Sequence, residues 1–231
     1  MELNIIHLHV SEFYQKHKWL TVVEISIAVF MLIANLLGYL PFTSTIYVFI
    51  YAWLSLRFRK KGWKHIGLRK PERWSKTILI ALSVGILYQL LSLYAIEPLL
   101  SKLTGELPDV SLFRSLVGNL NLLLFWIAIS WSLAAFGEEM VYRGYFMNRI
   151  RGLFENEKTG WLLALLLSSV LFGGVHLYQG ISGMISVGLF GVVFAAVYFA
   201  SGKNLWASIL AHGISDTLGF VMIYYGVYPG I

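Results

Sequence analysis

About seven apolar stretches lie between residues 20 and 226, and most are long enough to cross a lipid bilayer. A transmembrane helix needs roughly 20 apolar residues, with about 17 as a lower limit. Charged residues make up only 13% of the chain, whereas soluble domains carry about 25%. The expected spans lie near 20–39, 42–57, 77–96, 119–141, 160–178, 181–201 and 204–226. The sequence therefore predicts an all-α polytopic transmembrane helical bundle of about seven spans, or six to eight because the second stretch is short.

The chain is expected to form a single domain, because no internal repeat and no Pro-, Gly- or Ser-rich linker divides it. Residues 1–18 mix charged and apolar side chains, which predicts an amphipathic segment on the membrane surface instead of a cleaved signal peptide. Residues 19–118 are expected to hold the N-terminal spans and a basic cytoplasmic loop, and residues 119–226 the core of the bundle. The chain has no cysteine, so disulfides and thiolate metal sites are excluded.

Basic residues predict the orientation, because Lys and Arg favour the cytoplasmic side of a membrane. With the N-terminus inside, 16 of the 18 Lys and Arg fall on the inner side, and nine of these lie between Arg57 and Lys76. Only Lys102 and Arg114 fall outside. We therefore expect a plasma membrane protein with a cytoplasmic N-terminus and an external C-terminus. The basic loop faces anionic lipid in this interpretation, and no nucleic-acid partner is expected, because no recognition module surrounds it.

Ionisable side chains within the apolar stretches are costly in hydrocarbon, so they mark candidate functional positions. Glu24 is an exception, since it lies about one turn from the basic end of the first span and is expected to reach the headgroups. Six others lie in or at the edge of later spans. These six are Glu138, Glu139, Arg143, His176, His212 and Asp216.

Glu138 and Glu139 are adjacent and point about 100° apart on an α-helix, so they can take different roles. Glu139 and Arg143 are four residues apart and can form an ion pair along one helical face. This pair is expected to be an ordinary salt bridge at a helix end, with a supporting role in the structure. Glu138 lacks that partner, and a carboxylate in a dry pocket suits a general base.

The two intramembrane histidines belong to similar four-residue spacings. Phe172 and His176 would share one helical face, and the glycines between them permit close backbone approach or a kink. Taken alone, such a histidine could be a hydrogen-bonded contact between helices. His212 and Asp216 are also four residues apart, so the imidazole and the carboxyl group can bond each other or point at one place.

These three motifs, in this order and within spans, resemble the CPBP family of intramembrane proteases, also called the Abi or CAAX-protease family. The family pattern is Glu-Glu-x-x-x-Arg, then Phe-x-x-x-His, then His-x-x-x-Asn or Asp. In this chain the motifs are Glu138–Arg143, Phe172–His176 and His212–Asp216. The resemblance covers roughly residues 119–220. Family members include the endopeptidase that trims prenylated CAAX proteins and bacterial proteins linked to bacteriocin processing and self-immunity.

The resemblance implies an intramembrane endopeptidase that acts on a membrane-associated peptide or protein. It assigns water activation to Glu138 and His176, and support of the tetrahedral oxyanion to His212 and position 216. Glu139, Arg143 and Phe172 would support them. Prenyl-trimming members carry Asn where this chain has Asp216. Because an ionised Asp cannot donate a hydrogen bond, Asp216 would be protonated, orient His212 or bind a metal.

Metal dependence stays open at this point. Glu138, His176 and His212 could supply three zinc ligands and leave one position for water. Nothing in the chain resembles the His-Glu-x-x-His helix of zincins, however, so the ligand pattern favours chemistry without a metal. No cofactor is therefore certain, and zinc is the candidate.

Two other classes of function compete with the protease. A non-catalytic bacteriocin self-immunity or scaffold protein could share the fold, and loss of a motif residue would favour it. An ion-coupled transporter could use the same acids as a relay, and repeated halves would favour it. The chain shows neither feature.

One geometric conflict remains between the motifs. Straight helices with the expected ends would place Glu138 near the inner surface and His176 near the outer one, about 20 Å apart in depth. A common site would require a tilt, a shifted span, or a break near Gly137 or near the glycine pair at 173–174.

Overall fold

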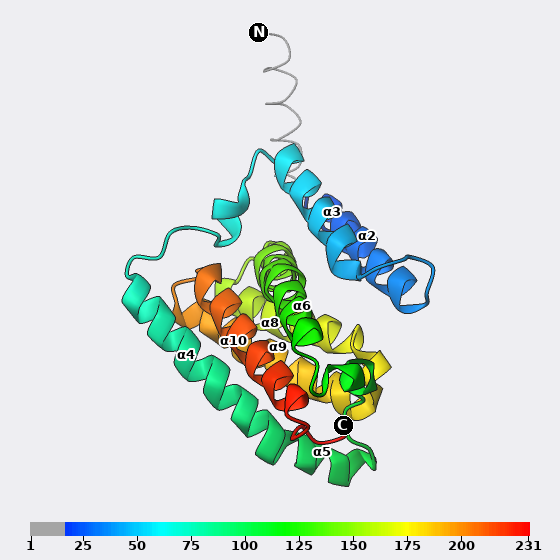
Figure 1. Cartoon of the computed structure of the whole chain (residues 1–231). Coiled ribbons are helices and arrows are strands. Elements are labelled where there is room, and N and C mark those ends of the chain that lie inside the picture. Colours follow the sequence, from blue (N-terminus) through cyan, green and yellow to red (C-terminus); the bar gives the residue numbers. More distant parts are fainter. Residues whose placement is uncertain (1–16) are drawn as a thin grey trace.

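A computed structural model describes residues 17–231, and these residues form helices without any strand (Figure 1). The expected amphipathic segment lies almost wholly outside the described residues. The all-α prediction is confirmed, and each expected span coincides with a helix. These helices are α2 (Lys18–Leu36), α3 (Ser44–Phe58), α4 (Trp74–Leu91), α6 (Leu120–Ile129), α8 (Glu157–Gly174), α9 (Gly180–Ala200) and α10 (Leu205–Tyr224).

Two of the helices continue further than the sequence predicted. After α4 the chain goes directly into η2 (Ser92–Ile96) and α5 (Glu97–Thr104), and after α6 into η4 (Ser130–Phe146) and α7 (Met147–Arg151). Three short 3₁₀ turns lie in the connections: η1 (Trp63–Ile66), η3 (Ser111–Leu116) and η5 (Leu177–Gln179). The predicted end at residue 141 is therefore wrong, because the helix runs on through the buried motif to Arg151.

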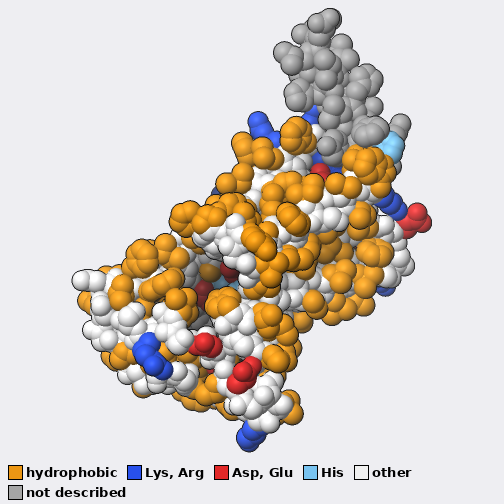
Figure 2. Space-filling view, turned by 90° about the vertical axis from the view of Figure 1, so that its right-hand side faces the viewer, with side chains coloured by type: hydrophobic (Ala, Val, Ile, Leu, Met, Phe, Trp, Pro, Cys, Tyr) orange, Lys and Arg blue, Asp and Glu red, His pale blue; other side chains and the backbone are white. Residues whose placement is uncertain are grey.

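Five helical elements in residues 17–231 are long and apolar enough to cross a membrane. They are Lys18–Leu36, Trp74–Thr104, Leu120–Arg151, Leu177–Ala200 and Leu205–Tyr224. The helices α3 and α8 complete the seven predicted stretches, and α3 is short, with 15 residues. The surface is largely apolar (Figure 2), as expected for helices that face lipid. The chain is an integral membrane protein.

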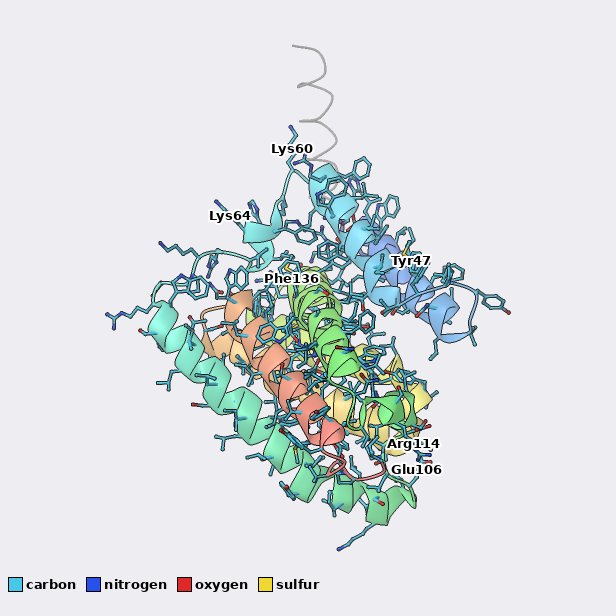
Figure 3. The ribbon with its side chains drawn as sticks, in the orientation of Figure 1. Tyr47, Lys60, Lys64, Glu106, Arg114 and Phe136 are labelled. Carbon is cyan, nitrogen blue, oxygen red and sulfur yellow. The ribbon has the colours of Figure 1, made fainter. Side chains whose placement is uncertain are left out.

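The helix α10 lies inside the bundle, packed against α4 on one side and η4 on the other (Figure 1). The α2–α3 hairpin packs against η4 and α7 at the edge of the bundle. Figure 3 shows Lys60 and Lys64 at one end of the molecule and Glu106 and Arg114 at the opposite end. The basic α3–α4 connection and the α5–α6 connection therefore face opposite sides.

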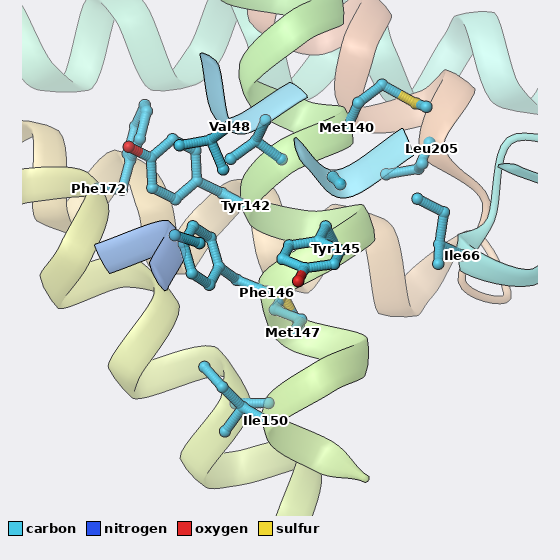
Figure 4. Close-up of a cluster of buried hydrophobic side chains, with 14 of the residues drawn as sticks. Val48, Ile66, Met140, Tyr142, Tyr145, Phe146, Met147, Ile150, Phe172 and Leu205 are labelled. Carbon is cyan, nitrogen blue, oxygen red and sulfur yellow. The ribbon is translucent and has the colours of Figure 1, made fainter. Parts of the chain in front are cut away.

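The main apolar core surrounds η4 and is made mostly of large side chains (Figure 4). Tyr142, Tyr145 and Phe146 of η4 are buried there beside Phe172 of α8. Small residues let neighbouring helices approach closely in membranes. A Cβ atom on Gly173 would lie 2.6 Å from the Met184 carbonyl oxygen of α9, so this glycine is needed where α8 crosses α9.

Glu24 does not reach the headgroups, and that expectation is wrong. Its side chain is buried between two arginines, with oxygen–nitrogen distances of 2.9 Å to Arg59 and 3.3 Å to Arg149. The two guanidinium groups also donate to the hydroxyls of Thr21 and Ser55, each at 2.9 Å. Both partners are distant in sequence, and the cluster joins α2, the end of α3 and α7. Because Arg59, Arg149 and the motif residue Arg143 are buried, three of the 16 inner basic residues do not face lipid.

Replacing Glu24 with Gln should destabilise the protein strongly. Removing one partner of a buried ion pair typically costs about 3–5 kcal/mol, because it leaves buried charge uncompensated. Glu155→Gln is the matched control, since Glu155 is exposed and 3.6 Å from Lys18, and exposed pairs contribute little. Thermal unfolding in one detergent should show a large decrease in unfolding temperature for Glu24→Gln and none for Glu155→Gln. Equal decreases in the two variants would contradict a stabilising role of the Glu24 cluster.

Candidate active site

One cavity of about 280 Å³ brings the predicted site residues together. It is lined by Glu138 of η4, Phe172 of α8, His176 just beyond α8, and His212 and Asp216 of α10. Other lining side chains are mostly apolar and include Trp126, Ile129, Val187, Phe190 and Phe220. Figure 2 shows acidic side chains recessed in a hollow of the apolar surface. The cavity is thus lined by ionisable side chains together with apolar side chains that disfavour bulk water.

The depth conflict between the motifs disappears because two expected helix ends were misplaced. The helix that carries Glu138 continues to Arg151, so Glu138 lies well inside it and not at its end. The helix α8 ends at Gly174, so His176 lies beyond the helix and does not share a helical face with Phe172. Its Nδ1 atom lies 2.8 Å from the Phe172 carbonyl oxygen, which fixes the ring at the cavity.

The helix η4 has π geometry over Ser130–Phe146, 17 residues. The Met147 N–H closes it by bonding the Tyr142 carbonyl oxygen, five residues back. Such helices are rare, usually short, and frequent at functional sites. The wider turn changes the direction in which successive side chains point, so an ideal α-helix is a poor guide to the placement of Glu138 and Glu139.

Glu139 is fully buried and forms the ionic centre of the site. Its Oε1 atom lies 2.9 Å from Arg143 Nη1 and 3.0 Å from His212 Nδ1. Arg143 also donates to the Gly191 carbonyl oxygen of α9 at 3.3 Å and lies over the Phe172 ring at 4.7 Å. The sequence predicted the Glu139–Arg143 pair, but it missed the contact with His212. The carboxylate therefore links η4 to α10, and Arg143 extends the link to α8 and α9.

His212 lies between two carboxyl groups. Its Nδ1 atom faces Glu139, and its Nε2 atom lies 3.5 Å from Asp216 Oδ2. The hydroxyl of Ser130 donates to the same Asp216 oxygen at 2.5 Å. The Phe190 ring packs against the imidazole with a centroid distance of 4.7 Å. The orientation of His212 is thus fixed by groups from three helices, with Nε2 on the side of Asp216, which lines the cavity.

Glu138 has a different environment from its neighbour. No arginine or lysine of residues 17–231 forms an ion pair with it, and its hydrogen bond comes from the Thr45 hydroxyl, at 3.4 Å from Oε1. The sequence did not indicate Thr45 or Ser130, because hydroxyl side chains are common at ordinary contacts between membrane helices. The two adjacent acids are therefore separated into one with ionic partners in the core and one that lines the cavity.

The candidate zinc ligands do not fit a metal centre in this arrangement. No group of three or more His, Asp or Glu residues in the described part of the chain is placed to hold a metal ion. We therefore derive no step that passes through a metal.

Comparison with known proteins finds one family model that matches the segment carrying these motifs. Residues 120–218 match the model of a family described as type II CAAX prenyl endopeptidase Rce1-like. The match spans all three motifs and confirms the resemblance predicted from them. No curated protein and no solved structure matches the chain. Residues 120–218 are therefore similar to a family of membrane proteases.

Proposed function

We propose that the protein is an intramembrane endopeptidase that hydrolyses a peptide bond of a membrane-associated protein or peptide. The observation that carries the proposal is the shared cavity, which is lined by Glu138, His176, His212 and Asp216. The neighbouring Glu139 is turned away from the cavity into an ionic contact. The family match supports the protease class.

Glu138 acts as the general base in this proposal, because it lines the cavity and forms no ion pair within residues 17–231. A carbonyl oxygen only accepts hydrogen bonds, so the contact with Phe172 places a proton on Nδ1 of His176. The neutral ring then offers the Nε2 lone pair to water. Glu138 takes a proton from that water, and the water oxygen attacks the scissile carbonyl carbon. When the C–N bond breaks, the leaving amine receives the proton from Glu138.

His212 stabilises the oxyanion of the tetrahedral intermediate. Because Nδ1 donates to Glu139, donation to an oxyanion must come from a protonated Nε2. The carboxyl groups of Glu139 and Asp216 lie on the two sides of the ring, next to its two nitrogen atoms. Each such donor is typically worth about 2.7–4 kcal/mol in the transition state. Asp216 accepts from Ser130, which favours a role in orienting His212 over a role as the donor.

One prediction of this proposal separates the two adjacent acids. Glu138→Gln should abolish turnover without lowering the unfolding temperature, because Glu138 has no ionic partner to lose. Glu139→Gln should lower stability by about 3–5 kcal/mol, since it breaks a buried ion pair, and reduce activity with it. The assay follows fluorogenic peptides, with and without a prenylated C-terminal cysteine, in liposomes that contain the purified protein. Near-normal hydrolysis by Glu138→Gln would exclude this base, and no hydrolysis by the wild type would favour the immunity or scaffold alternative.

The membrane orientation is a second part of the proposal. Lys60 and Lys64 lie at the end of the molecule opposite Arg114 (Figure 3), so the basic connection can face the cytoplasm of a plasma membrane protein. Reporter domains fused after residues 66, 108 and 231 should report inside, outside and outside. An inside signal at residue 231 would contradict an external C-terminus.

The role of Asp216 gives a further prediction, which also tests for metal. Asp216→Asn should retain activity and lose less than the ~100-fold expected on removal of a direct oxyanion donor. The reason is that an amide oxygen can still accept from Ser130 and His212. Activity is measured across pH for the wild type and the variant, and metal content by elemental analysis. Stoichiometric zinc in the wild type that is lost together with activity in Asp216→Asn would contradict the orienting role and indicate a metalloprotease.

A further inference from the structure

The α2–α3 hairpin lies outside residues 120–218, yet it contacts the proposed catalytic base. Thr45, in the first turn of α3, is 4% exposed. Its hydroxyl lies 3.4 Å from Glu138 Oε1 and makes the hydrogen bond that Glu138 forms within residues 17–231. A residue from the part of the chain without a family match therefore contacts the residue on which the proposed chemistry depends.

The direction of this hydrogen bond follows from the neighbouring residue Thr43. The Thr43 hydroxyl caps the start of α3 by accepting from the Thr45 N–H at 3.3 Å. It donates its own proton to the Thr45 hydroxyl at 3.1 Å. Each hydroxyl has one proton to give, so that of Thr45 remains for Glu138. The three groups form an ordered series in which the carboxylate is the final acceptor.

The residue before Glu138 permits this approach of α3 to η4. A Cβ atom on Gly137 would lie 2.8 Å from the Thr45 Cγ2 methyl group, closer than real Cβ contacts. Gly137 therefore provides the space in which Thr45 reaches the carboxylate. Thr45 is also distant from the Glu24 cluster, which fixes the opposite end of α3 to α2 and α7.

We propose that Thr45 is a positioning residue for the catalytic base. By donating to Oε1 it fixes the rotation of the Glu138 carboxylate and leaves Oε2 for the water that His176 also contacts. The distance of 3.4 Å is long for an O–H···O bond, as is common for catalytic hydrogen bonds before substrate binds. The inference rests on the proposed function and deepens it, because it makes the N-terminal hairpin part of the active site.

Two substitutions separate the hydroxyl from the methyl group of Thr45. Thr45→Val keeps the shape and removes the donor, and Thr45→Ser keeps the donor and removes the methyl group. We expect kcat of Thr45→Val to fall roughly 10–100-fold, the effect of losing one hydrogen bond to a charged group, with KM nearly unchanged. Thr45→Ser should keep most of kcat. The assay is the liposome assay with the fluorogenic peptide that the wild type cleaves, and thermal unfolding is measured for each variant.

Comparison with Glu138→Gln distinguishes failure of this inference from failure of the proposed function. If Glu138→Gln is inactive and Thr45→Val has wild-type kcat, Thr45 does not position the base. A merely structural role is indicated if Thr45→Ser and Thr45→Val lose activity and thermal stability alike, and this also overturns the inference. Thr45→Ala is the second donor-free variant, and it replaces Thr45→Val if that variant does not fold. If Glu138→Gln itself cleaves the peptide, Glu138 is not the general base, and the inference about Thr45 is overturned together with that assignment.

Discussion

The rest of the site depends on the ionic contacts of the buried Glu139 carboxylate. A charge in a membrane protein's interior is tolerated when partners compensate it, and Glu139 has two, Arg143 at 2.9 Å and His212 at 3.0 Å. Through Arg143 the contact reaches the Gly191 carbonyl group of α9. Once these groups are in place, His212 can turn only its other nitrogen toward Asp216, and Glu138 is left to line the cavity.

Two adjacent glutamates thus have different surroundings, which in other paired acids lead to different roles. Glu139 is fully buried, with Arg143 and His212 as its ionic partners, and it does not line the cavity. Glu138 faces a cavity with apolar walls and one weak hydroxyl donor, so its lone pairs are available to water. The π geometry of η4 contributes to this separation, because it sets the angle between the two side chains.

Periodicity and local spacing predicted the parts of this structure that depend on near neighbours in sequence. Apolar runs located the helices, and four-residue spacings indicated the Glu139–Arg143 pair and the approach of His212 to Asp216. Contacts between residues that are distant in sequence leave no such spacing pattern, so the sequence did not predict them. Glu24 looked like a headgroup-seeking residue because its partners, Arg59 and Arg149, lie on other helices. The roles of the site residues in catalysis stay predictions, since proximity in a cavity does not by itself establish chemistry.

The hairpin offers a physical reason why a segment without family motifs should matter for the proposed catalysis. The helix α3 has 15 residues and is therefore roughly 22 Å long. Its last turns are fixed by the Glu24 cluster, and its first turn carries Thr45 beside Glu138. A continuous helix is stiff over this length, so the buried ion pairs at one end restrict where Thr45 can lie at the other. Loosening the Glu24 cluster should therefore disturb Glu138 from a distance, even though no residue of the cluster lines the cavity.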